Sequence, residues 1–136
     1  MSDFPKVRFG ALCDDVRRED NGKLIFLGVY GESVLVASFP ARLRLANPVW
    51  FELKEPYNGN IWSQVLLDDE KIMEGVGPAE MGAGNPLITI QPIPIQVPRE
   101  GMLSFQLKFS EDGEWQTTVT IPIRPNPSSN ASPQPS

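Results

Sequence analysis

Two neighbouring stretches decide the fold class: MLSFQLKF at residues 102–109 and WQTTVTIPI at residues 115–123. Apolar residues alternate with polar ones in the first stretch, as in a strand with one buried face. The same alternation in the second stretch predicts a buried face made of Trp115, Thr117, Val119, Ile121 and Ile123. Between them lies Glu111-Asp112-Gly113-Glu114, whose Asp-Gly pair is typical of a tight type I′ turn. We therefore predict a terminal β-hairpin.

A similar pattern opens the chain. Residues 7–16 predict one strand, Asn21-Gly22 predicts a second type I′ turn, and residues 23–30 predict the return strand. Within the return strand, Leu24-Ile25-Phe26-Leu27 is apolar on both faces. Such a run indicates either a central strand that is covered on both sides or a contact at the rim of the sheet.

The middle of the chain continues the strand pattern. Further strands are predicted at residues 33–37, 49–53, 61–67, 72–76 and 87–97, with Asp68-Asp69-Glu70-Lys71 as the turn of another hairpin. Pro92 and Pro94 lie two residues apart, so both remove hydrogen-bond donors from the same side of their strand, which predicts an edge strand. We expect an all-β fold, an antiparallel β-sandwich of immunoglobulin-like or jelly-roll-like topology with seven to nine strands.

Length and composition favour one domain with a tail. A chain of 136 residues fits one domain, which we place at residues 1–124. Residues 125–136 consist almost entirely of Pro, Ser, Asn, Gln and Ala. Such a segment has little to bury and cannot offset the entropy of ordering, so we expect it to be disordered.

Charge and cysteine content limit the partners and the compartment. The net charge is −5, which argues against nucleic acid and against anionic membranes as partners. The first residues lack the apolar segment of a signal peptide, and no run of 18 apolar residues occurs. One cysteine cannot form an intrachain disulfide. We therefore expect a cytoplasmic protein.

Catalytic signatures are missing. The chain contains no histidine, so a Ser-His-Asp triad, a Cys-His pair and histidine-ligated metals are excluded. Cys13 without a histidine partner is interpreted as a small packed residue. The acidic groups at 14–15, 68–70 and 111–114 do not have calcium-loop spacing, and the last two fit turns. We expect neither an enzyme nor a bound metal or cofactor.

The most unusual stretch is the glycine-rich segment from Gly75 to Pro86. It has no Lys-Ser/Thr of a phosphate-binding loop, and we interpret it as a long mobile loop joining two strands. Recognition is expected at residues 77–85 together with the turn at 57–60. Glu80 and Met81 would supply a charge and an adaptable apolar contact, and Tyr57 with Asn58 a rigid anchor.

The opening hairpin also carries a resemblance. Cys13-Asp14-Asp15-Val16-Arg17, followed by Gly22-Lys23-Leu24 and Gly28-Val29-Tyr30-Gly31, resembles an uncharacterised bacterial domain-of-unknown-function family of small β-sandwich proteins. The resemblance implies a bacterial or phage origin and a sandwich, and it implies no activity. It makes Asp14 and Arg17 the competing candidate binding residues.

These observations favour a non-catalytic module that binds another protein. The alternative is a self-assembling structural subunit of a virion or an appendage, and a homo-oligomer is left open. A small-ligand-binding protein or a carboxylate-based enzyme is the third interpretation.

Overall fold

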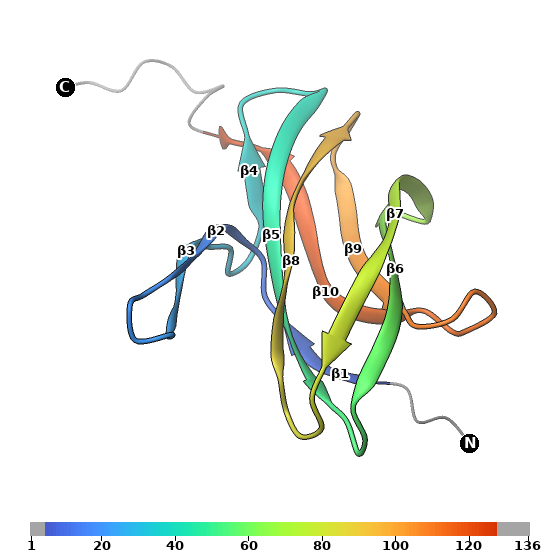
Figure 1. Cartoon of the computed structure of the whole chain (residues 1–136). Coiled ribbons are helices and arrows are strands. Elements are labelled where there is room, and N and C mark those ends of the chain that lie inside the picture. Colours follow the sequence, from blue (N-terminus) through green and yellow to red (C-terminus); the bar gives the residue numbers. More distant parts are fainter. Residues whose placement is uncertain (1–4, 128–136) are drawn as a thin grey trace.

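The computed structural model describes residues 5–127 and confirms an all-β sandwich (Figure 1). The first sheet has the order β1-β5-β2-β3, and a further strand, β8, pairs with the other side of β5. The bounds of its strands are β1 (Lys6–Gly10), β2 (Cys13–Arg18), β3 (Leu24–Val29), β5 (Ala41–Glu52) and β8 (Leu87–Val97). The second sheet has the order β4-β10-β9-β6-β7, with bounds β4 (Val34–Val36), β10 (Gln116–Pro125), β9 (Gly101–Lys108), β6 (Tyr57–Leu67) and β7 (Glu70–Met81). The ten strands found within residues 5–127 exceed the seven to nine expected.

The core lies between the two sheets. Every second residue of the central strands points inward, as in Leu103, Phe105 and Leu107 of β9. The inward-facing side chains form a large cluster and a smaller one around Phe51 and Phe109. The larger cluster consists of Leu12, Val34, Val36, Ala41, Leu45, Val65, Leu67, Ile95, Val97, Leu103, Phe105, Ile121 and Ile123.

The terminal hairpin is confirmed, but its turn and part of its inward face are not as expected. The connection spans residues 109–115, so it is not a two-residue turn, and Trp115 lies outside the strand. The β9–β10 register shifts between Thr117 and Val119. This bulge places one extra residue in β10, so Thr118 is buried and Thr117 is exposed. Alternation returns at Ile121 and Ile123, which are buried as predicted.

The glycine-rich segment is not a long loop. Strand β7 continues through it to Met81 and pairs with β6 along its whole length, from Glu70 opposite Leu67 to Met81 opposite Tyr57. Val76, Pro78 and Glu80 are exposed, whereas the residues between them face inward. Small residues at the inward positions are compatible with a strand, and only residues 82–86 remain as the connection to β8.

Two predictions about turns and edges are confirmed. Asp68 and Asp69 form the β6–β7 turn, where the Asp68 carboxylate accepts a hydrogen bond from the Met102 amide (3.0 Å). Arg99 pairs with Asp68 and Glu70 at the same place. Strand β8, which contains Pro92 and Pro94, pairs only with β5 and is an edge strand.

The last strand, β10, extends one residue beyond residue 124, the predicted end of the domain. Arg124 and Pro125 pair in parallel with Leu35 and Val36 of β4, and the Asn126 amide donates to the Val36 carbonyl. The rest of the predicted tail, residues 128–136, lies outside the described residues. Within residues 5–127, no helix has the length and apolarity that a bilayer crossing requires.

Candidate functional site

The β2–β3 hairpin projects from the side of the sandwich (Figure 1). It joins the first sheet through a single ladder pair, Cys13 opposite Ala46. Beyond Cys13, β2 separates from β5 and pairs only with β3, from Cys13 opposite Val29 to Arg18 opposite Leu24. The predicted first strand is therefore interrupted: Ala11 and Leu12 belong to no strand, and they separate β1, which pairs with β5, from β2, which pairs with β5 only at Cys13 and otherwise with β3.

The base of the hairpin is held by Asp14. Tyr30 donates a hydrogen bond from its hydroxyl to Asp14 Oδ1 (2.5 Å), and the Tyr30 amide donates to the Leu12 carbonyl (2.8 Å). The Asp14 carboxylate lies over Gly28, in the space that a Cβ atom at this position would occupy. Burial, followed by the hydrogen bond to Asp14, raises the pKa of Tyr30 to about 12. Asp14 thus has a structural partner within the hairpin.

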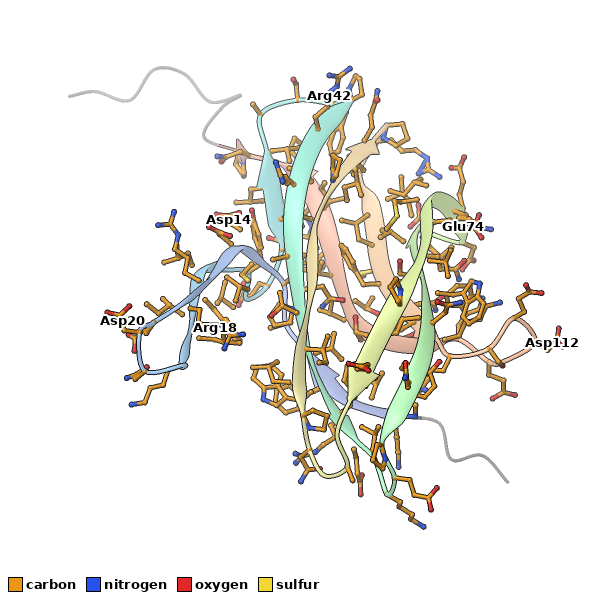
Figure 2. The ribbon with its side chains drawn as sticks, viewed as in Figure 1. Asp14, Arg18, Asp20, Arg42, Glu74 and Asp112 are labelled. Atoms are coloured by element: carbon orange, nitrogen blue, oxygen red, sulfur yellow. The ribbon has the colours of Figure 1, made fainter. Side chains whose placement is uncertain are left out.

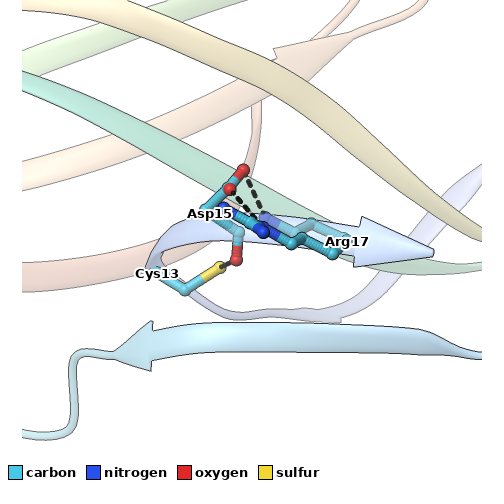
Figure 3. Close-up of polar contacts among 4 residues, drawn as sticks. Cys13, Asp15 and Arg17 are labelled. Atoms are coloured by element: carbon cyan, nitrogen blue, oxygen red, sulfur yellow. Dashed lines mark hydrogen bonds and ion pairs between the residues drawn. The ribbon is translucent and has the colours of Figure 1, made fainter. Parts of the chain in front are cut away.

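Cys13 is fully buried at the root of the hairpin, and its thiol donates to the Asp15 carbonyl (3.4 Å; Figure 3). Burial is the main cause that raises the pKa of this thiol; the carboxylates of Asp14 and Asp15 add to it, while the hydrogen bond opposes it. A thiol that stays protonated is a weak nucleophile. The geometry therefore agrees with a packed residue.

Arg17 and Asp15 form an ion pair along β2, with 3.2 Å between Arg17 Nε and Asp15 Oδ2 (Figure 3). Asp15 Oδ1 also accepts a hydrogen bond from the Val16 amide (2.9 Å). Both side chains are largely exposed, so the pair contributes little to the stability of the fold. It leaves Arg17 at the surface of the hairpin, available to a partner.

The tip of the hairpin differs from the predicted type I′ turn. The Gly22 amide donates to the Glu19 carbonyl (2.9 Å) and the Glu19 amide donates to the Lys23 carbonyl (2.8 Å). Gly22 has a φ of 87°, whereas Asn21 is not among the residues with positive φ. This is a three-residue loop with a type I turn and a glycine bulge, and Asn21 Oδ1 caps it by accepting from the Lys23 amide (3.0 Å).

The two faces of the hairpin differ. Val16, Leu24 and Phe26 lie on the face toward the sandwich and are half-buried. Phe26 contacts Trp50 edge-to-face at 5.7 Å between ring centroids, and Phe9 stacks on the same indole at 4.5 Å.

The opposite face carries an exposed row, Ile25 (40%), Leu27 (38%) and Val29 (55%). The apolar run Leu24–Leu27 predicts either a central strand or a strand at the rim of the sheet. The first prediction is wrong and the second is confirmed, because β3 is an edge strand.

The loop site expected at residues 57–60 and 77–85 is largely not available. Met81 is 4% exposed and belongs to the smaller core cluster. The Tyr57 ring packs edge-to-face on Phe109, and its hydroxyl lies 2.6 Å from the Asn60 carbonyl oxygen and 3.1 Å from that of Phe109. Asn58 and Glu80 are exposed and opposite each other across the β6–β7 ladder. They lie far from the hairpin that carries Asp14 and Arg17 (Figure 1).

Sequence reasoning missed the β3 row as a contact surface. The signal was present in Leu24-Ile25-Phe26-Leu27, a strand without a charged residue that is apolar on both faces. The contacts of Trp50 with Phe9 and Phe26 were missed because a period-two pattern does not show which side of a sheet faces solvent.

No cluster of three or more metal-ligating side chains occurs within residues 5–127. Neither a protein-family model nor a curated protein matches this chain, and the resemblance of the opening hairpin stays a prediction.

Proposed function

We propose that this chain is a non-catalytic protein-binding module whose contact element is the β2–β3 hairpin. The observation that carries the proposal is the composition of β3. Its six residues, Leu24–Val29, include no charge and no proline, although it is the edge strand of its sheet. An unprotected edge offers backbone donors and acceptors to an extended segment of a partner.

Other edges of the described sandwich are blunted. β1 has five residues and carries Lys6 and Arg8, and β4 has only three residues. β8 contains two prolines, and β7 carries Pro78 together with several charges. Since proteins commonly protect edges in these ways against unwanted pairing, the open edge of β3 supports a role in pairing.

The side chains of β3 support the same surface. Of the seven large hydrophobic residues exposed within the described part of the chain, three lie in this one strand. Ile25, Leu27 and Val29 point to one face, so a strand added to β3 would place its own alternate side chains beside this row. The backbone would supply affinity and the row would supply specificity.

The test compares capture of host proteins by three forms of the chain. The double variant Ile25→Lys/Leu27→Lys places charges in the row and on the edge, while Val76→Lys is the matched control, because Val76 is 60% exposed on β7. Proteins from an extract of the source organism are quantified by mass spectrometry after capture. We expect a set retained by wild type and Val76→Lys and lost by the double variant. Equal recovery by all three forms would sink the proposal.

Self-assembly is the second candidate function, and the composition of β3 also favours it. Antiparallel pairing of β3 with β3 of another copy, centred on Phe26, would place Ile25 opposite Leu27. It would place no like charges opposite each other, because β3 has no charged residue. Light scattering gives the molar mass in solution. A mass near 15.1 kDa per particle supports the binding module, and a multiple that the double variant abolishes supports self-assembly.

A further inference from the structure

A hollow of about 380 Å³ lies where the hairpin separates from the sandwich. It forms because β2 leaves β5 after the Cys13–Ala46 pair, so the two strands diverge. Its lining comes from four strands: Asp15, Val16, Arg17 and Arg18 of β2, Leu24 of β3, Arg44 of β5 and Thr89 of β8. Val16, Arg18 and Leu24 belong to the face of the hairpin toward the sandwich, whereas Asp15 and Arg17 lie opposite Leu27 and Ile25, on the face of the exposed row.

The lining is strongly basic in a chain whose net charge is −5. It contains three arginines and one carboxylate, and that carboxylate, Asp15, is already matched by Arg17 and by the Val16 amide. Within residues 5–127, neither Arg18 nor Arg44 has a carboxylate at ion-pair distance, whereas Arg99 has two. Arg18 makes one long hydrogen bond, to the Gly22 carbonyl at 3.4 Å. Two unmatched guanidinium groups at one hollow attract an anion.

We propose that this hollow binds a phosphoryl group, either free phosphate or a phosphate monoester. A carboxylate can be satisfied by one guanidinium fork, whereas two forks from different strands and the Thr89 hydroxyl suit a dianion with several terminal oxygens. Val16 and Leu24 give the hollow an apolar wall against which the organic part of an ester can pack. The volume accommodates a phosphate together with a small ester group.

Binding would also connect two parts of the molecule. Arg18 belongs to the projecting hairpin, on its side toward the sandwich, and Arg44 belongs to β5 (Figure 2). The Cys13–Ala46 ladder pair and the Phe26–Trp50 contact also join these parts. A phosphoryl group held by both arginines therefore restrains the hairpin against the sandwich. This inference does not depend on the proposed function.

The experiment follows backbone amide NMR shifts of the whole chain during titration with sodium phosphate, and separately with glycerol 2-phosphate. Sodium chloride at the same ionic strength is the salt control. Arg18→Gln and Arg44→Gln each remove one charge from the hollow. Arg42→Gln is the matched control, because Arg42 lies two residues from Arg44 on the same strand, is exposed and does not line the hollow.

Saturable shifts are expected at Arg18, Arg44 and Thr89 with phosphate and not with chloride. The dissociation constant should rise at least about tenfold in Arg18→Gln and Arg44→Gln, and stay within about twofold in Arg42→Gln. Tighter binding of free phosphate would identify the ion as the ligand, and tighter binding of the ester would identify a phosphorylated compound. Shifts equal to those in chloride, or an equal loss in Arg42→Gln, would overturn the proposal. Should Arg44→Gln not fold, Arg18→Gln against Arg42→Gln gives the same decision.

Discussion

Gly28 shows how a single residue shapes the hairpin. Its φ is 68°, a region that L side chains rarely adopt, and the Asp14 carboxylate occupies the space where a Cβ atom would lie. Gly22 has a similar φ of 87° but has nothing within 4 Å of its would-be Cβ. Substitutions at the two positions therefore distinguish the effect of a strained φ, present at both, from the effect of a steric clash, present only at Gly28.

We predict that Gly28→Ala lowers the free energy of unfolding by about 2–4 kcal/mol, and Gly22→Ala by about 1 kcal/mol. An alanine at position 28 must displace the Asp14 carboxylate from Tyr30. An alanine at position 22 is destabilising only because its φ is positive. Urea denaturation of the two variants measures the difference. An equal effect at both positions would show that Asp14 moves away freely and does not hold the base of the hairpin.

The Tyr30–Asp14 hydrogen bond predicts a pH dependence. The pKa of Tyr30 rises from 10.0 to about 12 in the folded chain, so the folded state holds this proton more tightly than the unfolded state does. The stabilisation is complete below pH 10 and is lost as the pH rises toward 12. The difference in unfolding free energy between wild type and Tyr30→Phe should therefore shrink over this range. A difference that stays constant up to pH 12 would contradict the raised pKa.

At the scale of elements, the bulge in β10 places a polar group in the core. Thr118 Oγ1 lies 2.9 Å from Asn47 Oδ1 and 3.1 Å from the Phe105 carbonyl oxygen, and Asn47 Nδ2 donates to the Ala11 carbonyl (2.7 Å). Both side chains are buried, so each depends on the other for hydrogen bonding. This network connects β5, β9 and β10 with the segment between β1 and β2.

Thr118→Val keeps the shape of the side chain and removes the hydroxyl. We predict a loss of about 1–3 kcal/mol in unfolding free energy, because Asn47 Oδ1 is left buried without its donor. Thr117→Val is the matched control, since Thr117 is exposed on the same strand, and it should change stability by less than about 0.5 kcal/mol. Thermal or urea unfolding of the pair checks this. A Thr118→Val variant as stable as wild type would mean that the network is not needed.

An element could be predicted where the feature that determines it lies within the element's own stretch of sequence. The β9–β10 hairpin and the edge position of β8 were predicted, because alternation and the proline spacing are local features of the sequence. Strand β7 was predicted only up to residue 76, because the glycines of the segment weaken its strand pattern and only the pairing with β6 shows that the strand continues to Met81. The bulge at Thr117 and Val119 was also missed, since a register shift depends on the neighbouring strand.

For the candidate site, the sequence indicated the right hairpin for a different reason. Asp14 and Arg17 were candidates through the resemblance, yet Asp14 serves the base of the hairpin and Arg17 pairs with Asp15. The β3 row follows from tertiary structure, because it is exposed only when β3 is an edge. Tyr57 and Met81 failed as exposed anchors because the turn predicted at residues 57–60 belongs to strand β6 and the loop predicted around Met81 belongs to strand β7.

At the scale of the whole molecule, the sandwich is a support that holds one hairpin away from the core. Both core clusters lie between the sheets, while the β2–β3 hairpin extends beyond them and keeps an open edge (Figure 1). The hydrophobic row lies on one face of this hairpin, and Arg18, which lines the basic hollow, lies on the other. We therefore propose that partners meet the hairpin, and not the β6–β7 region.

Site-specific photo-crosslinking in living cells of the source organism tests this claim most directly. A photoreactive amino acid replaces either Leu27 on β3 or Val76 on β7, two exposed apolar positions on different edge strands. After irradiation, we expect a discrete crosslinked product from the variant at Leu27 and none from the variant at Val76. The same products from both positions, or a product from Val76 alone, would contradict it.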